Sequence, residues 1–331
     1  MTSSESPRLA ARNERWPIAG SFTISRGAKT EAVVVVAELS DGRHRGRGEC
    51  VPYARYNETV ASVTAALEAA AGKLALGLDR AALQREMPAG AARNALDCAF
   101  WDLEAKRAGK PAHDLAGLPA PHALTTAYTI SMGSPETMAE AARAASQRRL
   151  LKIKLGGAGD PERIAAVRRG APQSELIVDA NEGWTAKNLT ENLAACADAG
   201  VTLIEQPLPS DDDTALATVK RPVAICADEI VHDRASLAAL AGRYDAVNIK
   251  LDKAGGLTEA LAMAAEAERL GFRIMVGCMV ATSLSMAPAM LVAQRARVVD
   301  LDGALLLAKD RPDGLRYEGS LVHPPTSGLW G

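Results

Sequence analysis

Five charged residues recur at regular intervals in the second half of the chain, each at the end of a short apolar segment. Lys154, Asp179, Glu205, Asp228 and Lys250 follow one another at spacings of 22–26 residues. One strand–helix unit of a parallel barrel takes about that many residues, so these side chains are expected at one level on successive strands. That level, the carboxyl-terminal mouth of the barrel, is where barrel enzymes carry out their chemistry.

The acidic and basic members of this set predict different roles. Asp179, Glu205 and Asp228 on neighbouring strands are expected to converge as oxygen ligands, and an all-carboxylate cluster suits a hard cation, Mg²⁺ rather than Zn²⁺. Lys154 and Lys250 fall on strands 2 and 6 of eight, which face each other across a barrel. Two bases that face one carbon from opposite sides can remove a proton on one face and return it on the other, which inverts a stereocentre.

A second lysine accompanies Lys154 on its strand. Lys152 and Lys154 are separated by one residue, so both side chains are expected to point inward. Two ammonium groups so close together, beside a divalent cation, should lower each other's pKa and leave one lysine available as a base near neutral pH. The other lysine can then hold a carboxylate oxygen of a substrate.

Eight short apolar segments from residue 124 onward are predicted strands, and Ala-rich amphipathic segments separate most of them. Strands that alternate with helices at this pitch predict a parallel sheet, and eight strands favour a closed barrel over an open sheet. The expected strands are 124–130, 150–155, 175–180, 201–204, 223–227, 246–251, 272–277 and 297–301, with helices at 161–169, 189–199 and 257–270.

The first part of the chain predicts a separate α+β unit. A β-branched segment at 30–39, the turn Asp41-Gly42 and a segment at 45–50 indicate a hairpin, followed by helices at about 59–76 and 89–109. The expected division is an α+β capping domain at 1–122, a barrel domain at 123–308, and a tail at 309–331 that returns to the capping domain.

The composition argues against several classes of function. With 38 Lys and Arg against 40 Asp and Glu, the net charge of -2 offers no basic surface for nucleic acid or an anionic membrane. The polar segment 1–16 lacks the apolar core of a secretory signal, and no apolar run reaches the roughly 18–20 residues of a membrane span. Five scattered cysteines without a CxxC pair fit a reducing compartment, so a cytoplasmic protein is expected.

Taken together, these residues resemble the pattern of the enolase superfamily, and the resemblance covers nearly the whole chain. It implies a modified (β/α)7β TIM-like barrel, an α+β cap over its mouth, and one Mg²⁺ per subunit. A lysine on both strands 2 and 6 is typical of the group that contains muconate cycloisomerases, o-succinylbenzoate synthases and dipeptide epimerases. The matching segments are Arg93-Asn94-Ala95-Leu96-Asp97, Lys152-Ile153-Lys154, Asp179-Ala180-Asn181, Glu205-Gln206-Pro207, Asp228-Glu229, and Asn248 to Lys253 followed by Gly255-Gly256.

The predicted eighth strand discriminates among these three activities. Asp300 and Asp302 are two residues apart, so both carboxylates are expected on one face at the mouth. They would repel the anionic substrates of the muconate and succinylbenzoate enzymes but would attract the free ammonium group of a dipeptide. This arrangement resembles the dipeptide epimerases, in which such a pair holds the N-terminal amine.

The resemblance also implies further substrate contacts. Arg26 lies in a capping-domain loop similar to the one that covers the substrate in Ala-Glu epimerases, where the arginine pairs with the glutamate side chain. Segment 52–56 is expected to be the second covering loop, and Lys253 and Glu229 are expected to support the metal ligands. The pocket lining expected from the barrel consists of Thr129 at the end of strand 1, and Cys278 and Val280 after strand 7.

The sequence therefore predicts a Mg²⁺-dependent dipeptide epimerase that transfers a proton at the α-carbon of the C-terminal residue, with Lys152 holding the substrate carboxylate. The expected pair is L-Ala-L-Glu and L-Ala-D-Glu, a role tied to murein peptide metabolism. The alternatives are an elimination or cycloisomerisation of the o-succinylbenzoate synthase or muconate cycloisomerase type, a Schiff-base enzyme that uses Lys154 or Lys250, and a non-catalytic metal-binding scaffold. Superfamily members are often multimers, so a homo-oligomer is compatible with the sequence.

Overall fold

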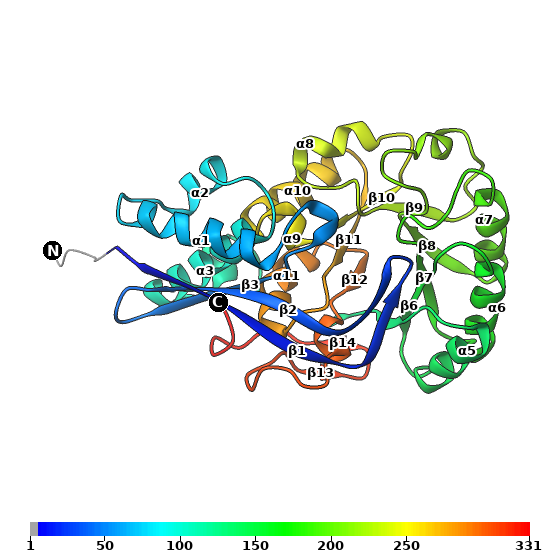
Figure 1. Cartoon of the computed structure of the whole chain (residues 1–331), viewed down its shortest axis with the longest axis horizontal. Helices are drawn as coiled ribbons and strands as arrows, with labels where there is room; N and C mark the ends of the chain where they lie inside the picture. The colour runs from blue at the N-terminus through cyan, green and yellow to red at the C-terminus, as the bar shows by residue number, and fades with distance from the viewer. Residues whose placement is uncertain (1–5) are drawn as a thin grey trace.

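The computed structural model describes residues 6–331, and its N-terminal part is an antiparallel sheet with helices packed on it (Figure 1). The strands pair in the order β1-β2-β3, and α3 packs against β3. The elements of this part are β1 (Arg8–Ile24), β2 (Gly27–Ser40), β3 (Arg45–Cys50), η1 (Ala54–Tyr56), α1 (Val60–Leu74), α2 (Arg80–Glu86), α3 (Ala91–Ala108) and α4 (Ala112–Leu115).

The expected hairpin and two long helices are present, but β1 was not predicted. In the sequence, 1–16 shows only as a polar segment, of which 1–5 lie outside the described residues. β1 is the edge strand of its sheet and alternates between exposed and half-buried residues over most of its length. An edge strand of this kind shows too few apolar residues to stand out as a strand.

Eight parallel strands form the second part of the molecule, in the unbroken order β5 to β12. The helices that follow most of these strands lie on the outside of the barrel (Figure 1). The strands are β5 (Tyr128–Ile130), β6 (Leu150–Lys154), β7 (Glu175–Asp179), β8 (Val201–Glu205), β9 (Ala224–Ala227), β10 (Ala246–Ile249), β11 (Arg273–Gly277) and β12 (Val298–Asp300). The helices are α5 (Pro135–Ala144), α6 (Asp160–Gly170), α7 (Leu189–Asp198), η2 (Thr214–Ala217), α8 (Arg234–Leu237), η3 (Ala238–Leu240), α9 (Leu251–Ala254), α10 (Leu257–Arg269), α11 (Ser283–Ala293) and η4 (Gly303–Leu306).

Hydrogen bonds between the segment that leads into β5 and the segment at β12 close the barrel. The backbone N–H of Ala127 donates to the carbonyl of Val299 at 2.8 Å, and the N–H of Leu301 donates to Thr126 Oγ1 at 2.9 Å. The barrel fold predicted from the alternation of strands and helices is therefore confirmed. The predicted strand at 124–130 divides in two, because β4 (Leu124–Thr125) leaves the barrel to pair with β14 (Leu321–Val322), which also pairs with β13 (Tyr317–Glu318).

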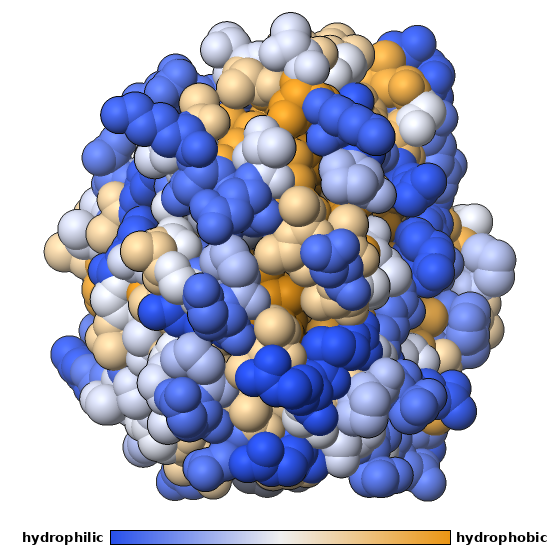
Figure 2. Space-filling model, turned by 90° about the vertical axis from the view of Figure 1, so that its right-hand side faces the viewer, coloured by the Kyte–Doolittle hydropathy of each residue, from blue (hydrophilic) through white to orange (hydrophobic). Residues whose placement is uncertain are grey.

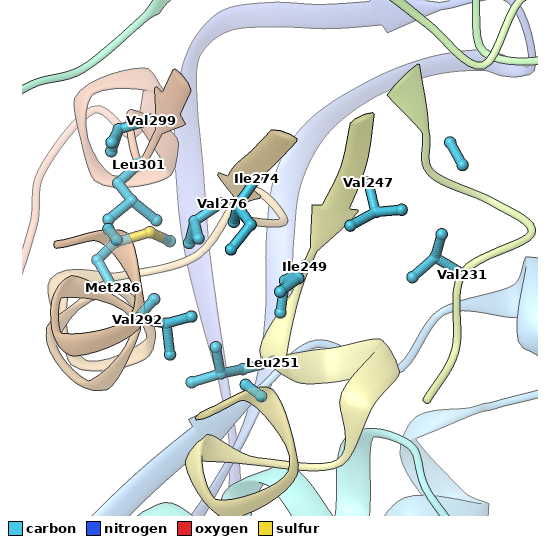
Figure 3. Packing of buried hydrophobic residues seen from close by; sticks show 14 of the residues in the cluster. Val231, Val247, Ile249, Leu251, Ile274, Val276, Met286, Val292, Val299 and Leu301 are labelled. Carbon is cyan, nitrogen blue, oxygen red and sulfur yellow. The ribbon is translucent and has the colours of Figure 1, made fainter. Parts of the chain in front are cut away.

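Most of the apolar core lies between the barrel strands and their helices. Val276 of β11 and Ile249 of β10 lie close to Val292 of α11 and to Leu251 of α9 in this layer (Figure 3). All residues of α11 are buried, so its sequence is apolar on every face and shows no amphipathic period. That composition explains why the sequence analysis did not predict α11 as a helix.

The outer surface of the barrel differs from this core. On the side that carries α5 to α7, hydrophilic residues cover most of the surface, and apolar residues show mainly in the grooves between them (Figure 2). Within residues 6–331, the structure has no helix that is both long enough and apolar enough to cross a membrane.

A second, smaller apolar layer lies inside the barrel and sets the direction of the site residues. Seven strands each contribute one member of this cluster, and the residue before β5 contributes the eighth; the members are Ala127, Leu150, Ile177, Leu203, Cys226, Ala246, Met275 and Val298. Because side chains of a strand alternate between its two faces, residues two and four positions further along point inward as well. These are the positions that the charged residues occupy.

Candidate active site

The charged residues predicted from the sequence lie in the next layers of the barrel interior, towards the carboxyl ends of the strands. Lys152, Asp179, Glu205, Asp228 and Asp300 each follow a member of the inner apolar layer by two residues. Lys154 pairs in register with Asp179, and Asp179 with Glu205, so these strands end at one level. The alternation of the strands therefore accounts for their convergence.

Asp179, Glu205 and Asp228 form a buried acidic trio. Their ligand oxygens lie within 4.8 Å of one another. Burial, followed by the negative charge of Asp179 and of Asp228, raises the pKa of Glu205 to about 8. Three carboxylates held this close repel one another, and a divalent cation shared between them would offset that repulsion. The donor set, three oxygens without nitrogen or sulfur, fits Mg²⁺.

Lys154 and Lys250 lie on the two sides of the acidic trio. Lys154 Nζ is 2.6 Å from Asp179 Oδ2, and Lys250 Nζ is 2.7 Å from Asp228 Oδ2 and 3.7 Å from Glu205 Oε1. Their strands, β6 and β10, are four positions apart in the eight-stranded order, which is the separation of opposite strands in a closed barrel. A small molecule above the trio would therefore have one lysine on each side.

Lys152 lies between these two lysines and contacts three carboxylates. Its Nζ is 2.6 Å from Glu205 Oε2, 2.7 Å from Asp300 Oδ2 and 3.1 Å from Asp179 Oδ2. Burial alone would lower the pKa of Lys152, but the charges of these three carboxylates outweigh it and raise the pKa well above the ordinary value. The expectation that two neighbouring ammonium groups beside a divalent cation lower each other's pKa stays a prediction, because this direction for Lys152 comes from its contacts with the carboxylates alone.

Residues next to the trio hold its members in place. Lys253 Nζ lies 2.5 Å from Asp228 Oδ1, and Asn248 Nδ2 donates to Glu205 Oε1 at 2.7 Å. The backbone N–H of Asp228 donates to Gln206 Oε1 at 2.9 Å. The trio is therefore oriented by side chains from β10, from α9 and from the segment that follows β8.

Asp300 and Asp302, the pair predicted at the eighth strand, are both buried but have different partners. Asp300 Oδ2 accepts from Lys152, while Asp300 Oδ1 has no hydrogen-bond partner within the described part of the chain. Asp302 Oδ2 accepts from the backbone N–H of Thr129 at 2.7 Å. Burial and the charge of Asp300 raise the pKa of Asp302 to about 7. Asp300 Oδ1 is therefore a buried acceptor without a partner among the described residues, on a side chain that lines the cavity described next.

A cavity of about 840 Å³ at the barrel mouth brings most of the predicted site residues together. Asp179 and Glu205 are buried and do not line it. The predicted residues in its lining are Arg26, Thr129, Lys152, Lys154, Asp228, Lys250, Cys278, Val280, Asp300 and Asp302. The cavity thus connects the lysines, one edge of the acidic trio and the Asp300–Asp302 pair.

Arg26 reaches this cavity from the turn between β1 and β2, a hairpin that extends from the N-terminal sheet towards the barrel (Figure 1). Arg26 Nη2 donates to Glu229 Oε1 at 2.8 Å, and Nη1 donates to the carbonyl of Asn181 at 2.9 Å and to Glu182 Oε2 at 3.4 Å. Glu229, expected only to support the metal ligands, also binds this arginine. The hairpin is thereby attached to the loops after β7 and β9.

Sequence reasoning missed several residues of the cavity. Phe22 of β1 lies with its ring centroid 5.6 Å from Lys154 Nζ, and the tip of β2 contributes Lys29. Arg55 binds Glu182 through two hydrogen bonds of 2.8 and 2.9 Å. The expected covering loop at 52–56 was the available signal for Arg55. Phe22 gave no signal because β1 was not predicted, and Lys29 gave none because the predicted strand began one residue later, at residue 30.

Comparison with known proteins identifies two family models that together span most of the chain. The mandelate racemase / muconate lactonizing enzyme N-terminal domain matches residues 8–117. The enolase C-terminal domain-like model matches residues 136–329.

Similar proteins of known activity match along nearly their whole length. The L-Ala-D/L-Glu epimerase of Escherichia coli strain K12 is 47% identical over 312 residues, which are 94% of this chain and 97% of that protein. The N-acetyl-D-glutamate racemase of a Pseudoalteromonas species is 43% identical over 300 residues, which are 90% of this chain and 95% of that protein.

Solved structures are also similar to this chain over nearly its whole length. An enolase family member from Agrobacterium tumefaciens with homology to dipeptide epimerases, which holds sodium and L-Ala-L-Glu, is 57% identical and superposes with a TM-score of 0.96 over 98% of this chain and 100% of that chain. A dipeptide epimerase from Enterococcus faecalis V583 in complex with Mg and L-Leu-L-Tyr is 28% identical, with a TM-score of 0.90 over 98% of this chain and 99% of that chain.

Proposed function

Since the chain belongs to the mandelate racemase / muconate lactonizing enzyme family of the enolase superfamily, we propose that it is a Mg²⁺-dependent dipeptide epimerase. The observation that carries this proposal is the placement of Lys154 and Lys250 on opposite sides of one acidic trio. The expected reaction is a 1,1-proton transfer at the α-carbon of the C-terminal residue, and L-Ala-L-Glu and L-Ala-D-Glu are the expected pair.

In the proposed reaction, the two lysines exchange one proton with the α-carbon. The neutral Nζ of one lysine takes the α-proton on its side, so that the C–H bond breaks and an N–H bond forms. The ammonium group of the other lysine then returns a proton on the opposite face, which gives the other epimer. A positioned acid or base of this kind contributes a factor of about 10²–10⁴ in rate.

The acidic trio is proposed to hold the cation. Asp179, Glu205 and Asp228 would be its ligands, and Lys152 would hold an oxygen of the substrate's α-carboxylate. Mg²⁺ bound there supplies positive charge against the second negative charge that builds on this carboxylate when the α-proton leaves. Lys152 adds a fixed charge to the same oxygens, in a position where it is 2% exposed and so largely shielded from water.

The Asp300–Asp302 pair is proposed to bind the N-terminal ammonium group of the dipeptide. Asp300 Oδ1 is buried and has no partner among the described residues, so an ammonium group would supply its missing hydrogen bond. Thr129 contributes through its backbone, since its N–H holds Asp302 Oδ2. Cys278 and Val280 complete the lining of the cavity on this side.

One further proposal concerns the setting of the enzyme. We infer that it acts in the cytoplasm on peptides derived from murein, and the free state of all five cysteines supports a reducing compartment. The sequence is compatible with a homo-oligomer without predicting one, and sedimentation velocity would determine the oligomeric state.

Two alternatives share the scaffold. An elimination or cycloisomerisation of the o-succinylbenzoate type, or racemisation of an N-acylated amino acid, would use the same lysines on a substrate without a free amine. The buried acceptor at Asp300 favours the dipeptide. Asp300→Asn should therefore lower activity on a dipeptide much more than activity on an amine-free substrate, for which only the contact of Asp300 with Lys152 changes.

Proton exchange in D₂O tests the proposed function directly. The enzyme with Mg²⁺ is incubated with L-Ala-L-Glu, and ¹H NMR follows the α-proton of the glutamate residue. We expect loss of that signal and growth of the signals of L-Ala-D-Glu, while the alanine α-proton is retained. An unchanged spectrum for this and for other dipeptides, together with turnover of an N-acylated amino acid, would replace the proposal by the second alternative.

A further inference from the structure

The charges around the outer part of the cavity are largely paired with one another. Arg26 binds Glu229 and Glu182, and Arg55 binds Glu182 through two hydrogen bonds. Glu31, another lining residue, forms an ion pair with Arg15. Arg26, which the sequence offered for recognition of a substrate carboxylate, and the neighbouring Arg55 are therefore already paired with carboxylates of the protein.

Lys29 is different, because no recorded ion pair in residues 6–331 includes it. It lines the cavity, is exposed to solvent, and lies with its Nζ 5.3 Å from the centroid of the Tyr53 ring. The hydroxyl of the same tyrosine accepts from Arg26 Nη2 at 3.2 Å. Tyr53 thus separates a paired cation, Arg26, from an unpaired one, Lys29.

The strand register fixes the direction of Lys29. It pairs with Phe22 across the β1–β2 hairpin, and the side chains of directly paired residues in antiparallel strands lie on the same face. The ring of Phe22 lies 5.6 Å from Lys154 Nζ. The face of the hairpin that carries Lys29 is therefore the face turned towards the proposed catalytic lysine.

From this geometry we propose that Lys29 is a specificity-determining residue, which selects dipeptides whose C-terminal residue has a carboxylate side chain. This inference rests on the proposed epimerase function. The α-carboxylate of the substrate is assigned to the deep end of the cavity at Lys152, so a cation at the outer end would bind a second, side-chain carboxylate. In this arrangement the guanidinium of Arg26 holds the β1–β2 hairpin against the barrel through its hydrogen bond to Glu229. Lys29 provides a positive charge that no ion pair among the described residues neutralises.

A pair of nearly isosteric substrates tests the proposal. Rates of epimerisation are measured for L-Ala-L-Glu and L-Ala-L-Gln with the wild-type enzyme and with Lys29→Met, Lys29→Arg and Lys187→Met. Lys187 is an exposed lysine outside the cavity lining and serves as the matched control. We expect Lys29→Met to lower kcat/KM for L-Ala-L-Glu about fivefold to tenfold, mainly through KM, as a partly exposed charge pair allows.

The second substrate, the Lys29→Arg variant and the salt dependence distinguish loss of the Lys29 charge from structural damage to the hairpin. The kcat/KM for L-Ala-L-Gln should change less than about twofold in Lys29→Met, and Lys29→Arg should retain the preference for glutamate. High salt should reduce the preference of the wild type and have little effect on that of Lys29→Met. Equal losses for both substrates, or an unchanged preference, would overturn the role of Lys29 while leaving the epimerase function intact. If the wild type turns over neither these two dipeptides nor any other, the proposed function itself is wrong.

Discussion

At the scale of single residues, the candidate site consists of buried charges held by partners of the opposite sign. Lys154 with Asp179, and Lys250 with Asp228, form two such pairs on either side of Glu205. Loss of one partner from a buried pair leaves an uncompensated charge, so a neutral hydrogen-bonding replacement disturbs folding less than alanine does. Glutamine is therefore the suitable substitute for either lysine.

The first prediction separates the roles of the two lysines. Lys154→Gln and Lys250→Gln should each reduce epimerisation by at least about 10²-fold, because one face of the α-carbon loses its acid or base. The remaining lysine can still exchange the α-proton that faces it. In D₂O, monitored by ¹H NMR, each variant should therefore label only one epimer, and the two variants should label opposite epimers.

Lys220→Gln, at an exposed lysine outside the cavity, provides the control and should behave as the wild type. Labelling of the same epimer by both variants would contradict the arrangement of two opposed bases. So would epimerisation at the wild-type rate in either variant.

The second prediction concerns the acidic trio. Treatment with EDTA should abolish activity, and Mg²⁺ should restore it. Mg²⁺ at 100 times its dissociation constant should also stabilise the folded protein by about 2.7 kcal/mol, which thermal unfolding detects without reference to activity. Asp228→Asn should shift this stabilisation to higher Mg²⁺ concentration, whereas Asp211→Asn, at an exposed carboxylate, should not. Thermal unfolding that does not respond to Mg²⁺ would contradict the assignment.

At the scale of elements, the strands of the barrel could be predicted because each is a short apolar run bounded by polar residues. Asp179 and Glu205 could be placed at strand ends for the same reason. The hairpin that carries Arg26 could not be placed, since its contact with Glu229 joins segments about 200 residues apart in the chain. Nor does local sequence show that Lys152 contacts three carboxylates, because these come from three other strands.

The third prediction concerns the packing of α3 on β3, which positions the N-terminal part of the fold. A Cβ atom at Gly48 of β3 would lie 2.1 Å from the carbonyl oxygen of Ala95 and 2.8 Å from the backbone nitrogen of Ala99, both in α3. Gly48→Ala therefore forces the helix away from the strand, and we expect a loss of roughly 1–3 kcal/mol or more in the free energy of unfolding.

Gly72 offers a matched control for this change. It is an exposed residue of α1, and a Cβ atom there meets nothing within 4 Å. Gly72→Ala should stabilise the protein by about 0.5–1 kcal/mol, since alanine is the better helix former. Urea unfolding followed by circular dichroism measures both variants. Equal effects of the two substitutions would contradict the close approach of α3 to β3.

At the scale of the whole molecule, the N-terminal part is attached to the barrel next to the proposed catalytic lysine Lys250. Arg93 of α3 donates to the carbonyl of Ala254 at 2.7 Å and to that of Gly255 at 3.1 Å. Gly255 has a φ of +81°, and a Cβ atom there would lie 2.4 Å from Arg93 Nε, so only glycine fits this contact. The loop after Lys250 is thus fixed by the same contacts that join the two parts.

The fourth prediction arises from Asp252, a buried carboxyl at this junction. Its Oδ1 accepts from the backbone N–H of Val51 at 3.0 Å and from Asn94 Nδ2 at 2.9 Å. Burial, and to a smaller extent the negative charges of Glu58 and Glu49, raise its pKa to about 7, from 3.8 in an unperturbed aspartate. The folded protein therefore retains this proton at pH values at which the unfolded chain has lost it.

The stability that this proton contributes is fully present below about pH 4 and is lost as the pH rises through about 7. Asp252→Asn has no proton to lose and keeps the acceptor oxygen. Relative to this variant, the wild type should lose up to about 4 kcal/mol of unfolding free energy between pH 4 and pH 8, since one pKa unit corresponds to about 1.36 kcal/mol. Urea unfolding across this range measures the difference. Asp212→Asn, at an exposed aspartate outside the junction, should leave the pH profile unchanged. A constant difference between wild type and Asp252→Asn from pH 4 to pH 8 would show that Asp252 is ionised throughout this range and that the junction tolerates its charge.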